Sequence, residues 1–205
     1  MRTFVAIDLP DAVRAAVARE QARLRTVCAV GKDIRWTRPE GLHLTLKFLG
    51  EVDAMRLREV IAALDGLGKF DPFEVGVGGF GFFPSARRPR VFWLGLEAPP
   101  ALGELARKVE AAMEALGFAR EDRPFQPHLT LARFDTPRPQ TALEAALERS
   151  DTVAFGRFVV TDFFLFESKL RPGGAEYSRL ARFPGAEAGE REAGFRPARP
   201  GGSGR

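Results

Sequence analysis

The stretch HLTLKFLG, from His43 to Gly50, and the stretch HLTLARF, from His128 to Phe134, share the tetrapeptide HLTL. The chain of 205 residues contains two histidines, and each opens one copy of this tetrapeptide. Both stretches alternate leucine with polar residues, which is typical of a β-strand with one buried face. In each case a predicted helix and a further strand follow. The repeated context predicts two related lobes, each contributing one strand to a shared site.

Strand alternation divides the residues of each HLTL copy between two faces. His43 and Thr45 share one face, and His128 and Thr130 share the equivalent face of the second strand. The leucines between them take the other face and anchor each strand on a hydrophobic layer. The two His–Thr pairs are therefore expected to face a cleft rather than the core.

Two imidazoles and two hydroxyls that meet across a pseudo-two-fold axis suit displacement at a phosphodiester. Imidazole gives or takes a proton near neutral pH, so one histidine can deprotonate a nucleophile while the other protonates a leaving oxygen. Threonine hydroxyls can donate hydrogen bonds to phosphoryl oxygens. Because the two frames match, the residues alone do not indicate which histidine is the acid.

Metal binding by the two histidines is the chemical alternative. Most protein zinc sites have three or four protein ligands, and Glu51 or Asp135 would have to complete the set without any motif spacing. We therefore expect neither a metal nor another cofactor. Cys28 is the one cysteine, so it cannot form an internal disulfide, and its apolar surroundings predict a small buried residue.

Composition predicts an ordinary globular protein with a mild preference for anionic partners. Hydrophobic residues make up 45% of the chain and charged residues 28%, with a formal net charge of +4. No apolar run approaches the length of a membrane span or of a signal peptide. We expect a cytoplasmic protein with no membrane association and no stable protein partner.

Hydrophobic periodicity predicts alternating strands and helices. Helices are expected over residues 10–27, 53–68, 100–118 and 141–150, and strands over residues 2–8, 34–37, 42–50, 73–83, 91–96, 128–134 and 175–183, with one or two strands in residues 153–168. The glycine-rich strand 73–83 should be bent or bulged. The pattern indicates an α+β fold with two ferredoxin-like lobes of βαβ type, antiparallel sheets related by a pseudo-two-fold, and a cleft between them. Residues 1–183 form this single domain, and residues 184–205 are expected to be a disordered tail.

At this point the residues resemble a known family. HLTLKFLGEV and PHLTLARF are similar to the paired HxTx motifs of the 2H phosphoesterase superfamily, and more closely to bacterial and archaeal RNA 2′,3′-cyclic phosphodiesterases, also called 2′-5′ RNA ligases. RTFVAIDLP, RWTRPEG, PFQP and LFESKLRPGGAEYSRL fall in the family's order around these motifs. The resemblance covers most of residues 1–183.

The resemblance implies the two-lobed fold and an RNA substrate. It implies hydrolysis of 2′,3′-cyclic phosphate ends to 2′-phosphomonoesters, and ATP-independent 2′-5′ joining of tRNA halves. By motif position it makes His43 the proton donor and His128 the proton acceptor, with Thr45, Thr130 and Arg133 on the phosphate. Two alternatives stay open: a non-catalytic RNA-binding module, and a related phosphodiesterase acting on small nucleotide cyclic phosphates.

Strand parity is at odds with one of these roles. Counted strictly, Arg133 falls on the leucine face and reaches the cleft only if the strand twists or ends near Ala132. Lys47 has the parity of the site, although a solvated lysine is the simpler interpretation. The basic loops are treated as solvated; they contain Arg87, Arg88, Arg90, Lys169 and Arg171. Trp36, Phe48 and Phe125 could stack a base, but such aromatics are more often core, and none is assigned to the site.

Overall fold

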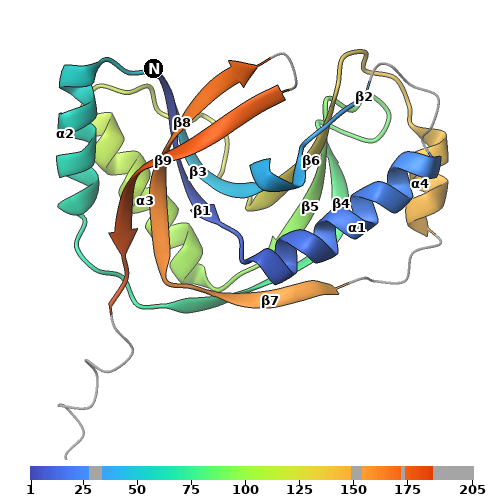
Figure 1. Ribbon diagram of the computed structural model, residues 1–205, viewed down its shortest axis with the longest axis horizontal. Coiled ribbons are helices and arrows are strands. Elements are labelled where there is room, and N and C mark those ends of the chain that lie inside the picture. Colours follow the sequence, from blue (N-terminus) through green and yellow to red (C-terminus); the bar gives the residue numbers. More distant parts are fainter. Residues whose placement is uncertain (28–33, 149–153, 172–173, 187–205) are drawn as a thin grey trace, which may run out of the picture.

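A curled sheet of nine strands runs through the computed structural model, which describes residues 1–27, 34–148, 154–171 and 174–186 (Figure 1). Its strands are β1 (Arg2–Asp8), β2 (Ile34–Trp36), β3 (His43–Glu51), β4 (Phe73–Phe83), β5 (Val91–Glu97), β6 (His128–Phe134), β7 (Ala154–Val160), β8 (Asp162–Arg171) and β9 (Gly174–Pro184). The helices are α1 (Asp11–Val27), α2 (Ala54–Asp65), α3 (Pro100–Ala115) and α4 (Thr141–Glu148), with a 3₁₀ turn, η1, at Pro39–Gly41.

The strand order is β7-β4-β5-β6-β3-β1-β8-β9, with β2 beside β6, and every pair is antiparallel. The central strands β3 and β6 meet through one residue pair, Leu44 opposite Leu129. Four strands lie on each side of that junction along this path. The α+β fold with two related halves is thus confirmed, and the two predicted sheets are joined into one.

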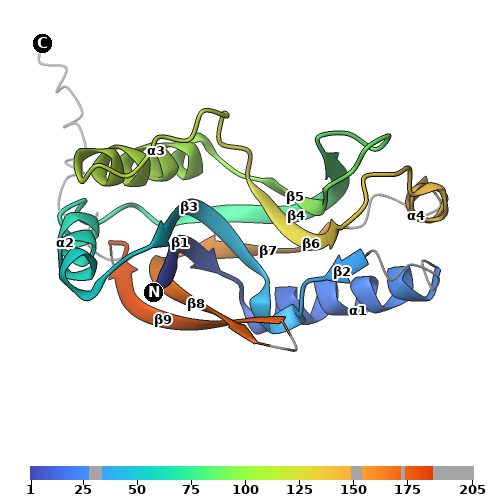
Figure 2. The same ribbon diagram turned by 90° about the horizontal axis from the view of Figure 1, so that it is seen from above.

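Two of the helices pack against the half of the sheet that does not contain their preceding strand. Both views place α2 beside α3 at one end of the molecule and α1 beside α4 at the other (Figures 1 and 2). Helix α1 follows β1 but packs against β7, whereas α3 follows β5 but packs against β3. Each half is therefore covered by a helix whose preceding strand belongs to the other half, which ties the two halves together.

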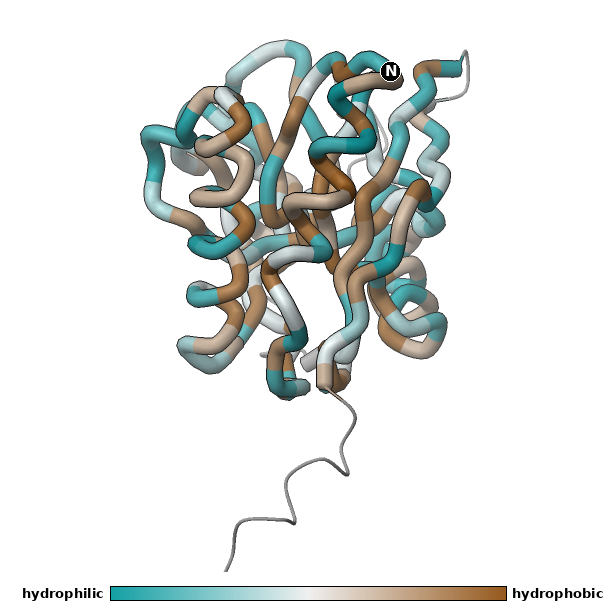
Figure 3. The backbone as a smooth tube through the Cα atoms, turned by 90° about the vertical axis from the view of Figure 1, so that its left-hand side faces the viewer, coloured by the Kyte–Doolittle hydropathy of each residue, from teal (hydrophilic) through white to brown (hydrophobic). Residues whose placement is uncertain are grey.

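The leucines of the two HLTL copies lie in the core as predicted. Ile7, Leu44, Leu129 and Leu94 are consecutive cross-strand partners and form a buried row across the middle of the sheet. Figure 3 shows apolar residues along the strands in the interior and polar residues at outer turns. Burying such a side chain contributes about 1.5–3 kcal/mol, so this row holds both strands in register.

Most predicted elements agree with the structure to within a few residues. The long segment 153–168 is two strands, and β8 continues through Ser168 to Arg171. Helix α2 begins where Asp53 accepts hydrogen bonds from the N–H groups of Met55 and Arg56, both at 2.9 Å. Cys28 and residues 149–150 lie outside the described residues.

The fold extends slightly beyond the predicted end of the domain at Phe183. Strand β9 ends at Pro184, and the N–H groups of Gly185 and Ala186 donate to the carbonyls of Thr161 and Phe70, both at 2.7 Å. These three residues therefore belong to the fold rather than to a tail. Residues 187–205 lie outside the described residues, so the expected disorder there stays a prediction.

The glycine-rich strand β4 is bulged, as expected. Its register against β5 shifts between Val77 and Phe80, and Gly79 in between has a φ of 75°. Further along, a Cβ on Gly81 would lie 2.1 Å from the indole of Trp93. The missing side chain at Gly81 lets this indole lie flat across β4.

Candidate active site

The junction of β3 and β6 brings both His–Thr pairs together. Because Leu44 opposes Leu129 in an antiparallel pair, the flanking positions place His43 opposite Thr130 and Thr45 opposite His128. All four side chains alternate with the buried leucines, so they share the other face of the sheet. The two histidines occupy one diagonal of this arrangement and the two threonines the other. This is the place at which the sequence predicted the cleft.

Each imidazole is held by the same local hydrogen bond. The Nδ1 atom of His43 lies 2.8 Å from the carbonyl oxygen of Gly41, and Nδ1 of His128 lies 2.8 Å from the carbonyl oxygen of Gln126. A carbonyl accepts only, so Nδ1 carries the proton in both rings. Nε2 is therefore the nitrogen that exchanges a proton in each histidine.

Aromatic rings enclose His43. The ring of Phe4 stacks on the imidazole with centroids 4.6 Å apart, Tyr177 meets it edge-on at 5.1 Å, and Phe166 lies 6.4 Å away. Phe4 and Phe166 belong to a small apolar cluster on this face of the sheet. Tyr177 comes from β9, and a Cβ on Gly41 would approach it to 3.0 Å, so the glycine leaves room for the phenol beside the histidine.

His128 has a smaller aromatic surround. Phe83 meets its ring edge-on at 5.0 Å, and Trp93 lies 6.4 Å away. Its cross-strand neighbour on β5 is Gly95, which places no side chain beside it. Both histidines are partly buried, and fewer aromatic rings surround His128 than surround His43.

Burial lowers the pKa of both histidines. Desolvation is the main cause for His43, whose pKa falls to about 4; the Gly41 carbonyl and the charge of Asp8 oppose the shift, whereas Arg14 and Arg133 add to it. The pKa of His128 is also lowered, mainly by desolvation and further by Arg133. Both imidazoles are therefore largely neutral at pH 7 before a substrate binds.

Asp8 stands next to His43 on β1 and is held by two arginines. Its carboxylate accepts from Arg14 at 2.5 Å and from Arg179 of β9. Burial alone would raise the pKa of Asp8, but these two cations lower it below its usual value. Asp8 therefore stays ionised and contributes a fixed negative charge near His43.

Arg14 connects α1 to the segment that presents His43. Its guanidinium donates to the carbonyl oxygens of Pro39 at 2.8 Å and Leu42 at 3.0 Å as well as to Asp8. These carbonyls flank Gly41, whose own carbonyl holds Nδ1 of His43. The orientation of His43 thus depends on an arginine of α1.

A β-bulge in β6 explains how Arg133 reaches the face of the histidines. The partners of Phe92 and Trp93 on β6 are Ala132 and Thr130, so Leu131 is an extra residue on that strand. Leu131 and Ala132 are both buried, and Arg133 is exposed. The bulge turns Arg133 to the face of the histidines, contrary to strict alternation. Arg133 affects the pKa values of His43, His128 and Tyr177, which places its charge near all three.

The same bulge occurs in β3 and overturns the interpretation of Lys47. Val5 and Ala6 pair with Lys47 and Thr45, so Leu46 is the extra residue. Lys47 is 6% exposed, donates to Glu110 of α3 at 2.7 Å and donates to the Ala119 carbonyl at 2.8 Å. It is neither solvated nor directed to the site, because the bulge turns it toward the helices.

Buried polar groups support both bulges. On β6, the carbonyl of the extra residue Leu131 accepts from the N–H of Thr37 at 2.9 Å and from the side chain of Gln21 at 3.1 Å. On β3, the Lys47–Glu110 pair follows directly after the extra residue. These contacts join residues that are far apart in the sequence, so strand periodicity alone does not predict the two bulges.

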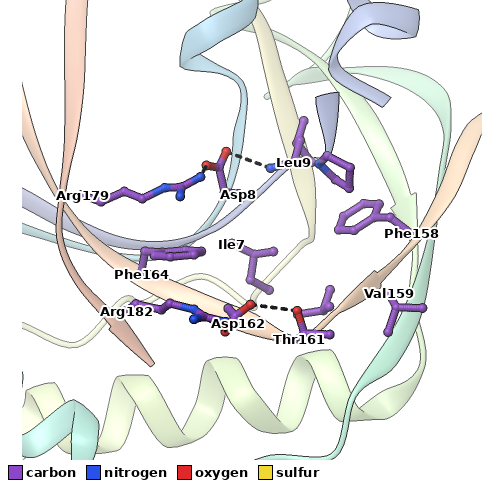
Figure 4. Close-up of a pocket in the computed structure, with 12 residues that line it drawn as sticks. Ile7, Asp8, Leu9, Phe158, Val159, Thr161, Asp162, Phe164, Arg179 and Arg182 are labelled. Atoms are coloured by element: carbon purple, nitrogen blue, oxygen red, sulfur yellow. Dashed lines mark hydrogen bonds and ion pairs between the residues drawn. The ribbon is translucent and has the colours of Figure 1, made fainter. Parts of the chain in front are cut away.

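A pocket of about 430 Å³ lies beside the histidine pair rather than over it. Figure 4 shows Arg179 reaching Asp8 on one side and Arg182 close to Asp162 on the other. The Arg179 guanidinium lies 4.5 Å from the ring centroid of Phe164. The pocket shares Asp8 with the surroundings of His43, but neither histidine lines it.

Other candidates from the sequence have partners elsewhere. Glu51 pairs with the N-terminal amine at 3.3 Å and Asp135 with Arg35 at 2.6 Å, so neither completes a metal site with the histidines. Within the described ranges, no group of three His, Cys, Asp or Glu residues is arranged to hold a metal. Arg90 donates to the Asp135 carbonyl. Near the turn of the β8–β9 hairpin, Lys169 pairs with Glu167 and Arg171 with Glu176.

Sequence reasoning missed the residues that surround His43. Asp8 ends the first strand and Tyr177 stands in the last, so neither lies near an HxTx motif in the chain. The alternation of Phe164 and Phe166 in FFLFES is a usable signal for an apolar face. Nothing local indicates that this face adjoins His43, because only the pairing of β1 with both β3 and β8 brings it there.

The fold and the paired strands define a protein with two opposed histidines and two threonines on one curled sheet. Its sequence matches the family model of the 2′-5′ RNA ligase superfamily over residues 4–171. An RNA 2′,3′-cyclic phosphodiesterase of Methanothermobacter thermautotrophicus is 35% identical over 89% of this chain and 98% of its own length. One of Thermotoga maritima is 37% identical over 88% of this chain and 93% of its own.

Solved structures agree with these sequence matches. The crystal structure of TT0787 of Thermus thermophilus has a TM-score of 0.72 and 35% identity, covering 90% of this chain and 97% of that one. E. coli LigT complexed with 3′-AMP has a TM-score of 0.72 and 28% identity, covering 91% and 98%. The chain belongs to the 2′-5′ RNA ligase superfamily. Within the described residues no helix is long and apolar enough to cross a bilayer.

Proposed function

We propose that this protein hydrolyses the 2′,3′-cyclic phosphate ends of RNA to 2′-phosphomonoesters, with its two histidines as acid and base. The observation that carries the proposal is the register at Leu44 and Leu129, which sets two imidazoles and two threonines around one point. Relatives named RNA 2′,3′-cyclic phosphodiesterase, which match most of the chain, support it. The 3′-AMP in a structural relative supports a nucleotide ligand.

The proposed reaction is an in-line displacement at phosphorus. The phosphate lies between the imidazoles, where Thr45, Thr130 and Arg133 hydrogen-bond its non-bridging oxygens. Nε2 of His128 takes a proton from the attacking water as the new P–O bond forms. Nε2 of His43 gives its proton to O3′ as the P–O3′ bond breaks, which leaves the phosphate on O2′. The two histidines end with exchanged protonation states and return to the start by proton exchange with water.

The pKa of His43 is expected to differ between the free site and the site with substrate bound. In the free protein, desolvation keeps the pKa of His43 near 4, so few molecules carry the proton that a donor needs at pH 7. A bound phosphodiester brings a negative charge next to the imidazole and raises its pKa. Substrate binding therefore raises the pKa of both imidazoles, and in the proposed mechanism His43 is the one that carries the proton while His128 is neutral.

Two finer assignments belong to the same proposal. The same displacement with the 5′-hydroxyl of a second RNA in place of water would break the P–O3′ bond and join the two ends through a 2′-5′ bond, and tRNA halves are the expected substrates. The cytoplasmic location and the lack of a stable protein partner stay predictions from the sequence.

Product analysis tests the proposal directly. An RNA oligonucleotide with a 2′,3′-cyclic phosphate end is incubated with the protein in EDTA, and the products are resolved by ³¹P NMR or chromatography. We expect conversion to the 2′-phosphate. Binding without any product would support the non-catalytic RNA-binding alternative and overturn the proposal. Turnover of cyclic mononucleotides with none of cyclic-ended RNA would restrict the activity to small substrates.

A further inference from the structure

Two arginines of the last strand line the pocket beside the histidines (Figure 4). Arg179 and Arg182 both stand on β9, three positions apart, so strict alternation would put them on opposite faces of the sheet. The pairing of β9 with β8 shifts register between them, with Leu180 as an extra residue. This bulge brings both arginines to the same face.

The face that the two arginines share is the face of the histidines. Arg182 is the cross-strand partner of Phe164, and Arg179 is the partner of Phe166. Both phenylalanines belong to the small apolar cluster that adjoins His43. The arginines therefore border the candidate active site along its β9 side, outside the residues proposed to hold the cyclic phosphate.

Arg179 is anchored one strand away from His43. Its guanidinium donates to the carboxylate of Asp8 and lies over the ring of Phe164, 4.5 Å from the centroid. Asp8 is the cross-strand neighbour of His43 on β1, and neighbouring strands lie ~4.8 Å apart. The cation thus stands beside the place proposed for the cyclic phosphate, at a spacing that one ribose–phosphate unit spans.

Positive charge is in excess around this pocket, although both arginines are paired. Arg14 and Arg179 share Asp8, and Arg182 pairs with Asp162 at 2.8 Å, so three cations meet two carboxylates. A guanidinium has five N–H donors, of which a bidentate carboxylate engages two. The side chains of Arg179 and Arg182 are 57% and 64% exposed. Both therefore have donors for an anion that enters the pocket.

We propose that Arg179 and Arg182 bind the phosphate on O5′ of the nucleoside that carries the cyclic end, which is the group that links this nucleoside to the rest of the RNA. This inference rests on the proposed function. A free nucleoside 2′,3′-cyclic phosphate lacks that group, so the pocket selects RNA ends over small cyclic nucleotides. Its volume of about 430 Å³ leaves room for a phosphate and the sugar attached to it.

A 5′-phosphate on a cyclic mononucleotide tests the inference without a second base. The probes are adenosine 2′,3′-cyclic phosphate and the same compound with a phosphate on O5′. We expect the added phosphate to raise kcat/KM of the unmodified protein about 10- to 100-fold, the factor that a charge-assisted hydrogen bond supplies. Arg182→Gln should remove most of this gain and leave turnover of the unphosphorylated compound unchanged. No gain in the unmodified protein, or an equal loss on both compounds in Arg182→Gln, would overturn the inference.

Arg171→Gln is the matched control, because Arg171 is a similarly exposed arginine that pairs with Glu176 at the far end of β8. It should change neither substrate; loss of the gain here as well would point to general charge attraction and contradict a site on β9. Arg179→Gln also releases Asp8, so it should slow both compounds, and the phosphorylated one more. An equal loss on both would contradict the place of Arg179 in the phosphate site.

Binding distinguishes failure of this inference from failure of the proposed function. Calorimetry measures the affinity of 2′-AMP and of adenosine 2′,5′-bisphosphate, the products expected from the two probes, and needs no turnover. A protein that hydrolyses neither cyclic compound would contradict the proposed function. Tighter binding of the bisphosphate, lost in Arg182→Gln, would still support the phosphate site. Equal affinities of the two ligands for the unmodified protein would refute it.

Discussion

Leu44 of β3 is the cross-strand partner of Leu129 of β6, and this one pair joins the two halves of the sheet. Both leucines are buried, so a slip by one residue would expose them and bury the histidines. The hydrophobic core thereby fixes the placement of the polar site on the opposite face.

Replacing either histidine should remove most of the activity. His43→Asn and His128→Asn each lose one proton-transfer group, which contributes about 10²–10⁴-fold to the rate. Because the two groups act in one step, the double variant should be little slower than either single variant. Single-turnover rates on a cyclic-ended oligonucleotide measure this, with circular dichroism as the control for folding. A single variant within a few-fold of the unmodified rate would exclude acid–base pairing.

The pH dependence should show two histidines with lowered pKa values. The chain has two histidines, so NMR titration gives two curves, which His128→Asn assigns. We expect His43 to titrate near pH 4 and His128 below 6.5, since burial disfavours both imidazolium ions. The profile of kcat/KM reports the free protein, so its maximum should lie below pH 6.5 whichever histidine is the acid. The kcat optimum should be higher, because bound phosphate favours imidazolium. A maximum of kcat/KM above pH 7 would contradict this.

Arg133→Gln should affect both binding and titration. Loss of a charge-assisted hydrogen bond to phosphate should raise KM about 10- to 100-fold. Since the charge of Arg133 lowers the pKa of both histidines, both NMR curves should move to higher pH in the variant. Arg87→Gln, in an exposed loop, is the control and should change neither. Unshifted curves would show that Arg133 does not face the site.

Lys47→Met should destabilise the fold, although the sequence suggests a solvated lysine. Its Nζ is buried, and its removal leaves the Glu110 carboxylate partly buried without its cation. Breaking such a pair costs on the order of 3 kcal/mol. Arg171→Met removes an exposed pair with Glu176 and should cost less than about 1 kcal/mol. Urea unfolding measures the free energy of unfolding of both variants. An equal loss of stability in the two would contradict the buried role of Lys47.

Much of the fold follows from local patterns. The strand 73–83 and the strand 128–134 are predicted to the residue, because alternation and turn residues act over short distances. The faces of His43, Thr45, His128 and Thr130 follow from the same alternation. Strict alternation was wrong beyond Leu46 and Leu131, because a bulge depends on the partner strand and on buried groups such as Gln21.

The sequence by itself determined the two HxTx strands, the α+β class and the chemistry that two histidines and two threonines allow. These depend on side-chain type and on the two-residue period of a strand. Only the tertiary structure decided that Arg133 faces the site, that Lys47 does not, and that aromatic rings from β1, β8 and β9 enclose His43. The physical reason is that burial and bulge geometry arise from pairing between strands far apart in the chain, and the lowered pKa of His43 follows from that burial.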